Sequence, residues 1–287
     1  FLADTGRPEV DRRLWLQTTN KIEAKAEKTY KGQEKHVTII SLNYFRDAQI
    51  DYPSSFSDLY QAKVKDKPTP DPHQVKAIAD VTDGLQKSDR GQMIMACGTG
   101  KTFTTLWIKE ALKSETTLVL LPSLSLLSQT MREWAWAGNT DFEILNVCSD
   151  KSVGKKTEDM APSDAPFAVT SDVHDISKFL QKSGPRVVFC TYQSSQLIAE
   201  AQIDTKVPTF DLAIADEAHR CAGKADAGFA TILDGEKIRA SKRLFTTATP
   251  RYFGKAIKDA SKAADLAVIG MDDETVFGPV IHQLTFG

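Results

Sequence analysis

Three short stretches of this chain combine residue types that handle phosphate groups. The first, Gly98-Thr99-Gly100-Lys101-Thr102, places two glycines directly before a lysine and a threonine. Glycines let backbone N–H groups approach a phosphate closely, and a helix that starts there adds partial positive charge. In that setting Lys101 reaches the β- and γ-phosphates and the Thr102 hydroxyl binds Mg²⁺. The stretch predicts a site for ATP and Mg²⁺.

The strict form of such a phosphate loop, G-x-x-x-x-G-K-[ST], is incomplete, because Met95 occupies the position of the first glycine. The alternative is that the glycines only make a turn into a helix. A strand expected over 92–97 and a helix expected over 101–113 favour the phosphate loop, since that motif requires a strand–loop–helix context. We assign Cys97 no role beyond filling a loop position.

The second stretch, Asp216-Glu217-Ala218-His219, follows an apolar run. At a strand end beside a phosphate loop, Asp216 can hold Mg²⁺, usually through water. The adjacent Glu217 can orient or deprotonate the attacking water. Alone, the pair is equally an exposed helix start stabilised by the helix dipole. With the phosphate loop, it predicts Lys101, Asp216 and Glu217 as the catalytic residues of nucleotide hydrolysis.

The third stretch, TTATP at 246–250, also lies at the end of an expected strand. Thr247 and Thr249 carry short hydroxyls that we expect to contact Glu217 or His219. Such contacts would couple the nucleotide site to another part of the protein. Threonine and proline are also common turn residues, so the stretch has little specificity alone. Outside this combination, His219 would be interpreted as a structural histidine.

These stretches follow apolar strands that alternate with helices. We expect strands at 92–97, 117–122, 143–149, 186–192, within 210–219 and within 242–250, and helices at 73–85, 101–113, 126–136, 172–182 and 193–201. Short apolar strands separated by helices are typical of an α/β fold with a parallel sheet covered on both faces. Ligands of such sheets bind beyond the carboxyl ends of the strands, where the three stretches lie.

Residues 1–66 have a different pattern, a small α/β segment. We expect a strand over 13–19, a helix over 20–34 and a strand over 36–45. Three prolines among charges in 63–72 predict a boundary, hence two domains, 1–66 and 67–287. Glu23-Ala24-Lys25 spells the E-x-K ending of a metal-dependent nuclease motif. In a helix these two side chains point to different faces, so we interpret them as helix surface.

Composition limits the possible partners. The formal net charge of the 287 residues is −2, so nucleic acid would have to bind local patches. Lys151, Lys155 and Lys156 form such a patch or, alternatively, a solvated loop. Four cysteines without a C-x-x-C pair give no zinc or redox pattern and fit a reducing cytosol, so we expect a cytoplasmic protein. The sequence contains no run of about 18 apolar residues, so it predicts no membrane span. The abrupt ends are typical of a fragment of a longer protein.

GTGKT, DEAH and TATP, each after an expected strand, together resemble the motifs of superfamily 2 helicases and translocases over residues 95–250. The resemblance implies a RecA-like P-loop NTPase domain. It also implies that Gln74, in DPHQ, contacts adenine, although the family often has arginine where Asp71 lies. Without the resemblance, Gln74 would be a helix-surface amide.

The same resemblance implies residues that contact the nucleic-acid backbone rather than its bases. They are Pro122 and Ser123 in LLPSLSLLSQ and Thr191 and Ser194 in TYQS. Left alone, Thr191 and Ser194 would equally be interpreted as helix caps.

IMACGTGKTF, LLPSLSLLSQTMREW, VFCTYQS and GMDDETVFGPVIHQLTFG are similar to the motor of single-polypeptide, type ISP, ATP-dependent restriction-modification enzymes. That family joins nuclease, motor, methyltransferase and target-recognition domains in one chain. Residues 1–66 resemble the C-terminal part of its Mrr-like nuclease domain, whose catalytic set would lie upstream. The implied partners are double-stranded DNA and a second RecA-like domain, which supplies arginines to the γ-phosphate. No second set of motifs follows residue 250, so we expect the isolated chain to bind ATP weakly and hydrolyse it poorly.

Three functions remain open. The leading hypothesis is an ATP-driven translocase on double-stranded DNA. The second is a helicase acting on RNA or single-stranded DNA. The third is a P-loop kinase or nucleotide-binding regulatory module, which explains GTGKT but not DEAH followed by TATP.

Overall fold

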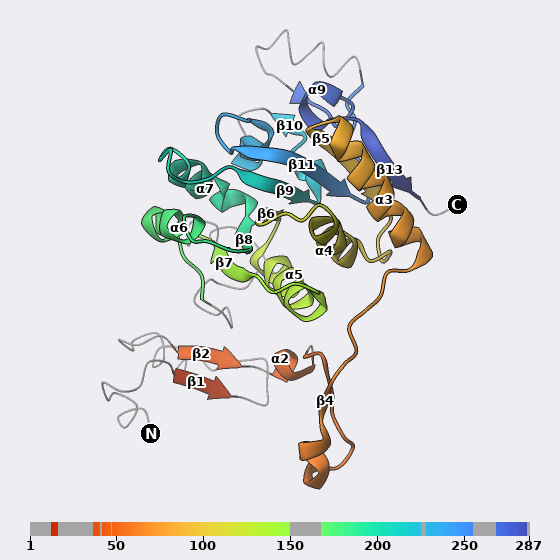
Figure 1. Cartoon of the computed structure of the whole chain (residues 1–287), viewed down its shortest axis with the longest axis vertical. Coiled ribbons are helices and arrows are strands. Elements are labelled where there is room, and N and C mark those ends of the chain that lie inside the picture. Colours follow the sequence, from red (N-terminus) through yellow and green to blue (C-terminus); the bar gives the residue numbers. More distant parts are fainter. Residues whose placement is uncertain are drawn as a thin grey trace. The chain divides into compact units, whose positions relative to one another are not determined.

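The computed structural model describes residues 13–16, 37–40, 42–46, 48–149, 168–224, 228–254 and 268–285 (Figure 1). The chain divides into two compact units, Phe1–Lys67 with Met160–Ala168, and Pro68–Asp159 with Val169–Gly287. Several expectations lie outside the described residues: the helix over 20–34 with its E-x-K stretch, and the lysines at 151, 155 and 156.

The larger unit is built on a seven-stranded sheet whose neighbouring strands are all parallel, in the order β13-β5-β11-β9-β6-β8-β7. All six expected strands are present. The strands are β5 Arg90–Met95, β6 Thr116–Leu121, β7 Glu143–Val147, β8 Arg186–Thr191, β9 Phe210–Asp216, β11 Ala240–Thr247 and β13 Val280–Leu284. β6 and β8 are buried along their whole length, as expected for a parallel sheet covered on both faces.

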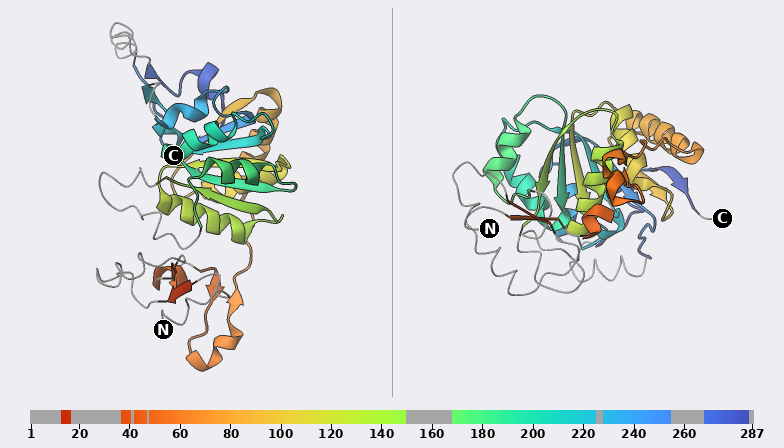
Figure 2. Two further views of the ribbon diagram at one scale, coloured as in Figure 1. Left: turned by 90° about the vertical axis from the view of Figure 1, so that its left-hand side faces the viewer. Right: turned by 90° about the horizontal axis from the view of Figure 1, so that it is seen from below.

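Helices cover the two faces of this sheet, as Figure 2 shows. α3 (Pro72–Lys87), α4 (Lys101–Ala111) and α5 (Leu124–Ala137) pack side by side on one face, and α6 (Val173–Leu180) and α7 (Ser195–Ala201) on the other. The five expected helices are thus present, and the predicted fold class is confirmed. Within the described part of the chain, no helix is long and apolar enough to cross a membrane.

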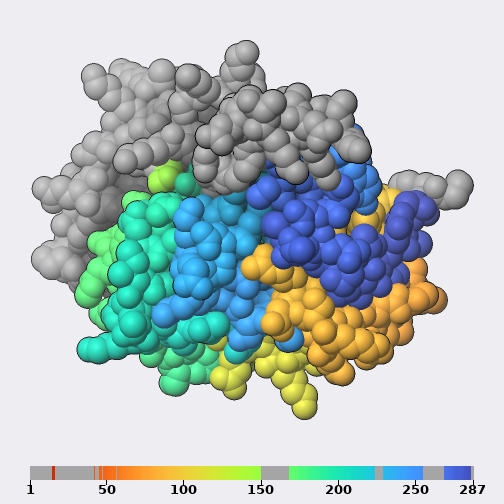
Figure 3. All heavy atoms as spheres, turned by 90° about the horizontal axis from the view of Figure 1, so that it is seen from above, coloured from red at the N-terminus to blue at the C-terminus, as the bar shows by residue number. Residues whose placement is uncertain are grey.

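The edge strand β13 was not predicted. It pairs with β5 and contacts α3, so β13 and α3 lie next to each other on the surface (Figure 3). Two glycines make room for its Ile281 side chain. A Cβ at Gly91 would lie 2.0 Å from Ile281 Cδ1, and one at Gly84 would lie 2.5 Å from Ile281 Cγ2. The close approach of β13 therefore depends on glycine at both positions.

The described residues of the smaller unit include two short strand pairs. β1 (Arg13–Leu16) pairs in parallel with β2 (Val37–Ile40), and α2 (Leu42–Arg46) follows. The prediction of a strand over 36–45 is wrong beyond Ile40, because the ladder with β1 ends there and the chain turns into a helix.

The boundary region is more ordered than a plain linker. β3 (Ile50–Asp51) pairs antiparallel with β4 (Lys63–Val64), on either side of the 3-10 helix η2 (Phe56–Gln61). One of the three prolines in the expected linker, Pro72, belongs to a helix and is the first residue of α3. A proline is tolerated at that position because its missing N–H would have no partner within the helix.

Candidate nucleotide site

The phosphate loop joins the end of β5 to the start of α4. Gly98 and Gly100 have φ angles of 77° and 76°, in the left-handed region that favours glycine. A side chain at Gly100 would also place its Cβ 2.3 Å from the amide nitrogen of Gln74. Both glycines are therefore needed for this loop conformation, and Lys101 begins the helix directly after it.

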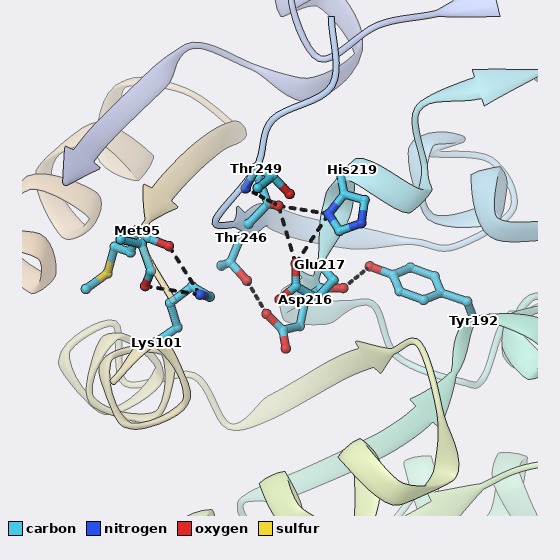
Figure 4. A network of polar contacts seen from close by, with 10 residues as sticks. Met95, Lys101, Tyr192, Asp216, Glu217, His219, Thr246 and Thr249 are labelled. Carbon is cyan, nitrogen blue, oxygen red and sulfur yellow. Dashed lines mark hydrogen bonds and ion pairs between the residues drawn. The ribbon is translucent and has the colours of Figure 1, made fainter. Parts of the chain in front are cut away.

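Lys101 points back over the loop. Its ammonium donates to the backbone carbonyls of Met95 and Ala96, at 3.2 and 3.4 Å (Figure 4). Its positive charge also lowers the pKa of Asp216, although burial acts more strongly in the opposite direction. Met95 is the last residue of β5 and is fully buried. Methionine is accommodated in place of the first glycine because that position belongs to the strand and faces the core.

Gln74 holds the phosphate loop from α3. Its side-chain oxygen accepts from the Asp71 N–H at 2.8 Å, which completes a capping box at the helix start. Its nitrogen donates to the carbonyls of Thr99 at 3.3 Å and Gly100 at 3.4 Å. The interpretation as a helix-surface amide is wrong, because the side chain is 5% exposed and fully engaged. Contact with adenine stays a prediction.

The sheet order places β11 between β5 and β9, so the three chemical stretches lie at neighbouring strand ends. The Thr246 hydroxyl, on β11, donates to the Asp216 carboxylate, on β9, at 2.8 Å. Removal from water raises the pKa of Asp216, and the hydrogen bond from Thr246 opposes that rise. Sequence reasoning missed Thr246. The sequence feature that could have indicated it is the adjacent pair Thr246 and Thr247, because neighbouring residues of a strand point to opposite sides.

Glu217 is the first residue after β9 and has a φ of 50°, in the left-handed region. Its carboxylate lies 3.3 Å from His219 Nδ1 and accepts from the Thr247 hydroxyl at 3.4 Å. Thr247 Oγ1 and His219 Nδ1 are 3.0 Å apart, which closes a triangle (Figure 4). The expected contacts of Thr247 are thus present. Thr249 differs from the expectation, since its side chain is exposed and its backbone N–H donates to Thr247 Oγ1 at 3.2 Å.

The residues expected to contact nucleic acid are held by neighbours within the protein. Ser123 caps α5 by accepting from the Leu126 N–H at 3.2 Å, and Pro122 is buried. Thr191 and Ser194 are buried at the end of β8, with their hydroxyls 3.0 Å apart. Thr191 and Ser194 occupy the N-cap positions of the 3-10 helix Tyr192–Ser194 and of α7, as the capping alternative predicts, but neither side chain makes a cap hydrogen bond. Their contact with a nucleic-acid backbone stays a prediction.

The residues predicted to bind magnesium fit a site that a nucleotide completes. Thr102 lies in the first turn of α4, which follows β5, and Asp216 supplies a carboxylate at the end of β9, with β11 between the two strands. Within the described residues, no group of three His, Cys, Asp or Glu side chains could hold a metal alone. Mg²⁺ at this position would therefore also need phosphate and water oxygens, which suit its octahedral coordination.

A parallel sheet with a phosphate loop and an acidic pair at its strand ends defines a P-loop NTPase of RecA-like fold. Residues 67–252 match the family described as type III restriction enzyme, res subunit, and residues 1–62 match a restriction endonuclease family. The chain belongs to the type III restriction enzyme res subunit family, whose match covers more than half of it.

Solved structures and curated relatives place the chain more narrowly. It is 33% identical to the DNA-bound type ISP restriction-modification enzyme LlaBIII, with a TM-score of 0.82, covering 99% of this chain and 19% of that one. For a nuclease-deletion mutant of the type ISP enzyme LlaGI, identity is 34% and the TM-score 0.59, covering 76% and 20%. The probable helicase A859L of African swine fever virus (isolate Tick/Malawi/Lil 20-1/1983) is 36% identical over 58% of this chain and 18% of its own length. The chain thus spans about a fifth of each relative.

Proposed function

We propose that residues 67–287 are the first RecA-like domain of an ATP-driven motor that moves on double-stranded DNA within a restriction-modification enzyme. The observation that carries this proposal is the strand order β5-β11-β9. It sets Lys101, Thr247 and Glu217 at three neighbouring strand ends, with the last two hydrogen-bonded. A kinase or a simple nucleotide-binding module gives no reason for the link between Glu217, His219 and Thr247.

The proposal assigns a role to each residue of the site. Lys101 leaves the carbonyls of β5 and binds the nucleotide phosphates, within the loop formed by Gly98, Thr99 and Gly100. Thr102 and Asp216 hold Mg²⁺, which when bound neutralises phosphate charge. Glu217 orients the attacking water. Gln74 contacts adenine, while His219, Thr247 and Thr249 couple the site to the motor.

The remaining assignments concern the longer protein. Residues 1–66 form the C-terminal part of an Mrr-like nuclease domain, in line with the restriction endonuclease match over 1–62. A second RecA-like domain, a methyltransferase and a target-recognition domain belong to other parts of the longer protein, in line with this chain's coverage of only 19% of LlaBIII. The protein contacts mainly the DNA backbone rather than the bases, through Pro122, Ser123, Thr191 and Ser194. The protein acts in the cytoplasm.

A strand-separating helicase is the second candidate, favoured by the similarity to a viral protein described as a probable helicase. Such a helicase uses the same ATP site but acts on RNA or single-stranded DNA. The two candidates therefore differ in which nucleic acid stimulates hydrolysis and in whether strands separate.

ATP hydrolysis by the full-length protein tests the proposal. We expect stimulation by double-stranded DNA, loss of turnover in Lys101→Ala, and normal turnover in Lys87→Ala, which removes an exposed lysine at the end of α3. Omission of Mg²⁺ should abolish turnover in the wild type. Full activity of Lys101→Ala would overturn the ATP site, and stimulation by RNA or single strands alone would favour the helicase.

A further inference from the structure

Tyr192 joins the segment after β8 to the acidic end of β9. It is the first residue of the 3-10 helix η5 (Tyr192–Ser194) and is fully buried. Its hydroxyl donates to the backbone carbonyl of Asp216, at an oxygen–oxygen distance of 2.7 Å (Figure 4). Because β6 lies between β8 and β9 in the sheet, the phenol reaches across the end of one strand.

Neighbouring groups fix the position of this phenol. The ring packs against Phe229 of η7 (Gly228–Leu233), with centroids 5.4 Å apart, and the hydroxyl interacts with the Cys221 thiol. The Tyr192 carbonyl accepts from the Ser195 hydroxyl at 2.7 Å. The ring therefore has little freedom, and the bond to Asp216 is held by its surroundings.

The bond restrains the peptide that joins Asp216 to Glu217. Glu217 has a φ of 50°, which non-glycine residues rarely adopt outside special sites. The orientation of the Asp216 carbonyl and the φ of Glu217 are set by the same peptide plane. A hydrogen bond to this carbonyl therefore helps to fix the direction in which the Glu217 side chain leaves the strand.

The same segment is tied to β7 on its other side. Thr191 and Ser194 flank Tyr192, their hydroxyls are hydrogen-bonded, and Ser194 Oγ accepts from the Ser149 N–H at 2.8 Å. The segment TYQS thus links the ends of β7, β8 and β9. A displacement of TYQS would move the partner of the Asp216 carbonyl.

We propose that Tyr192 is a positioning residue that couples DNA at the TYQS segment to the placement of Glu217. This inference rests on the proposed function. It treats the bond to Asp216 as the physical connection, so loss of the hydroxyl should weaken stimulation by DNA more than it weakens nucleotide binding.

The test uses Tyr192→Phe in the full-length protein, which keeps the ring and removes the hydroxyl. Turnover is measured with and without double-stranded DNA, together with the KM for ATP and the Kd for DNA. We expect the stimulation by DNA to fall about five-fold or more, with KM and Kd within about two-fold of wild type. Tyr60→Phe, an exposed phenol of η2, should behave as wild type.

A second variant keeps the test decisive if Tyr192→Phe does not fold. 4-Fluorophenylalanine at position 192 fills the place of the hydroxyl without donating, and 4-aminophenylalanine restores a donor. Stimulation should fall with the first and recover with the second. Unchanged stimulation in a folded non-donor variant, or an equal loss with both, would overturn the inference. If wild-type turnover survives Lys101→Ala, the proposed function fails instead, so the two failures are distinguishable.

Discussion

Glu217 combines a left-handed backbone with two side-chain partners, Thr247 and His219. A non-glycine residue in this region costs about 1–3 kcal/mol and persists where the surroundings hold it. Here the surroundings include strand β11 through Thr247. The arrangement points to a carboxylate whose direction matters, which is the requirement for orienting a water molecule.

Glu217→Gln should abolish turnover while nucleotide binding persists. The amide keeps the size and can still contact Thr247, but it cannot accept a proton from water. We expect kcat for ATP to fall by about 100-fold or more, with nucleotide affinity little changed. Steady-state kinetics and equilibrium binding on the full-length protein measure both. Glu200→Gln, on the exposed surface of α7, is the matched control, and equal kcat in the two variants would refute the role.

Thr246→Val should shift the acid limb of the pH–activity profile to higher pH. Burial raises the pKa of Asp216, and the Thr246 hydrogen bond opposes that rise, so its loss raises the pKa further. In the proposed site the ionised carboxylate is the form that binds Mg²⁺, so activity should be lost earlier as the pH falls. The profile of kcat/KM for ATP reports the shift.

The control for this experiment is Thr82→Val in α3, which removes a buried hydroxyl that has no hydrogen-bond partner. It makes the same chemical change in a different element from Asp216 and Glu217. An acid limb that coincides in Thr246→Val and Thr82→Val would show that the Thr246 bond does not tune Asp216.

At the scale of elements, the β13 edge depends on the glycines beneath it. Gly91→Ala would bring a methyl group into Ile281, and overpacking of this kind costs about 1–3 kcal/mol of unfolding free energy. Denaturant unfolding of this chain measures the loss. Gly254→Ala, where nothing lies within 4 Å of the added Cβ, should have a much smaller effect. Adding Ile281→Val should recover part of the loss, and equal stability of both glycine variants would contradict this packing.

The elements could be predicted where the sequence pattern is local. The six predicted strands are apolar runs, and the helices carry apolar faces, so their existence follows from periodicity. β13 is different, because Val280–Leu284 mixes polar residues with apolar ones at a sheet edge. The prediction of a strand beyond Ile40 was wrong for a related reason. The length of β2 is set by its pairing with β1, which ends at Ile40.

The sequence predicted which residues form the site, but not which of them contact one another. The positions of Lys101, Asp216 and Glu217 at strand ends followed from the order of motifs and strands. Thr246 could be distinguished from Thr247 only by register, which pairs Thr246 with Asp216. The Ser194 hydroxyl is hydrogen-bonded to Ser149 and the Thr191 hydroxyl to the Cys148 thiol, both beyond the end of another strand, so no local pattern reveals these contacts.

At the scale of the whole molecule, the proposed function assigns one half of the ATP site to residues 67–287 and the other half to a second RecA-like domain. We expect the isolated 287 residues to bind ATP weakly and to hydrolyse it at least about ten-fold more slowly than the full-length protein. The reason is that arginines from a second RecA-like domain would stabilise charge on the γ-phosphate. Direct comparison of kcat with DNA present checks this. Robust DNA-stimulated turnover by the isolated chain would contradict it.

Triplex displacement by the full-length protein tests the central claim most directly, because it reports movement along an intact duplex. With ATP and Mg²⁺, the wild type should release the third strand without separating the two strands of the duplex. Lys101→Ala should release none, and Lys87→Ala should behave as wild type. Clean strand separation, or displacement that survives Lys101→Ala, would contradict a translocase driven by this phosphate loop.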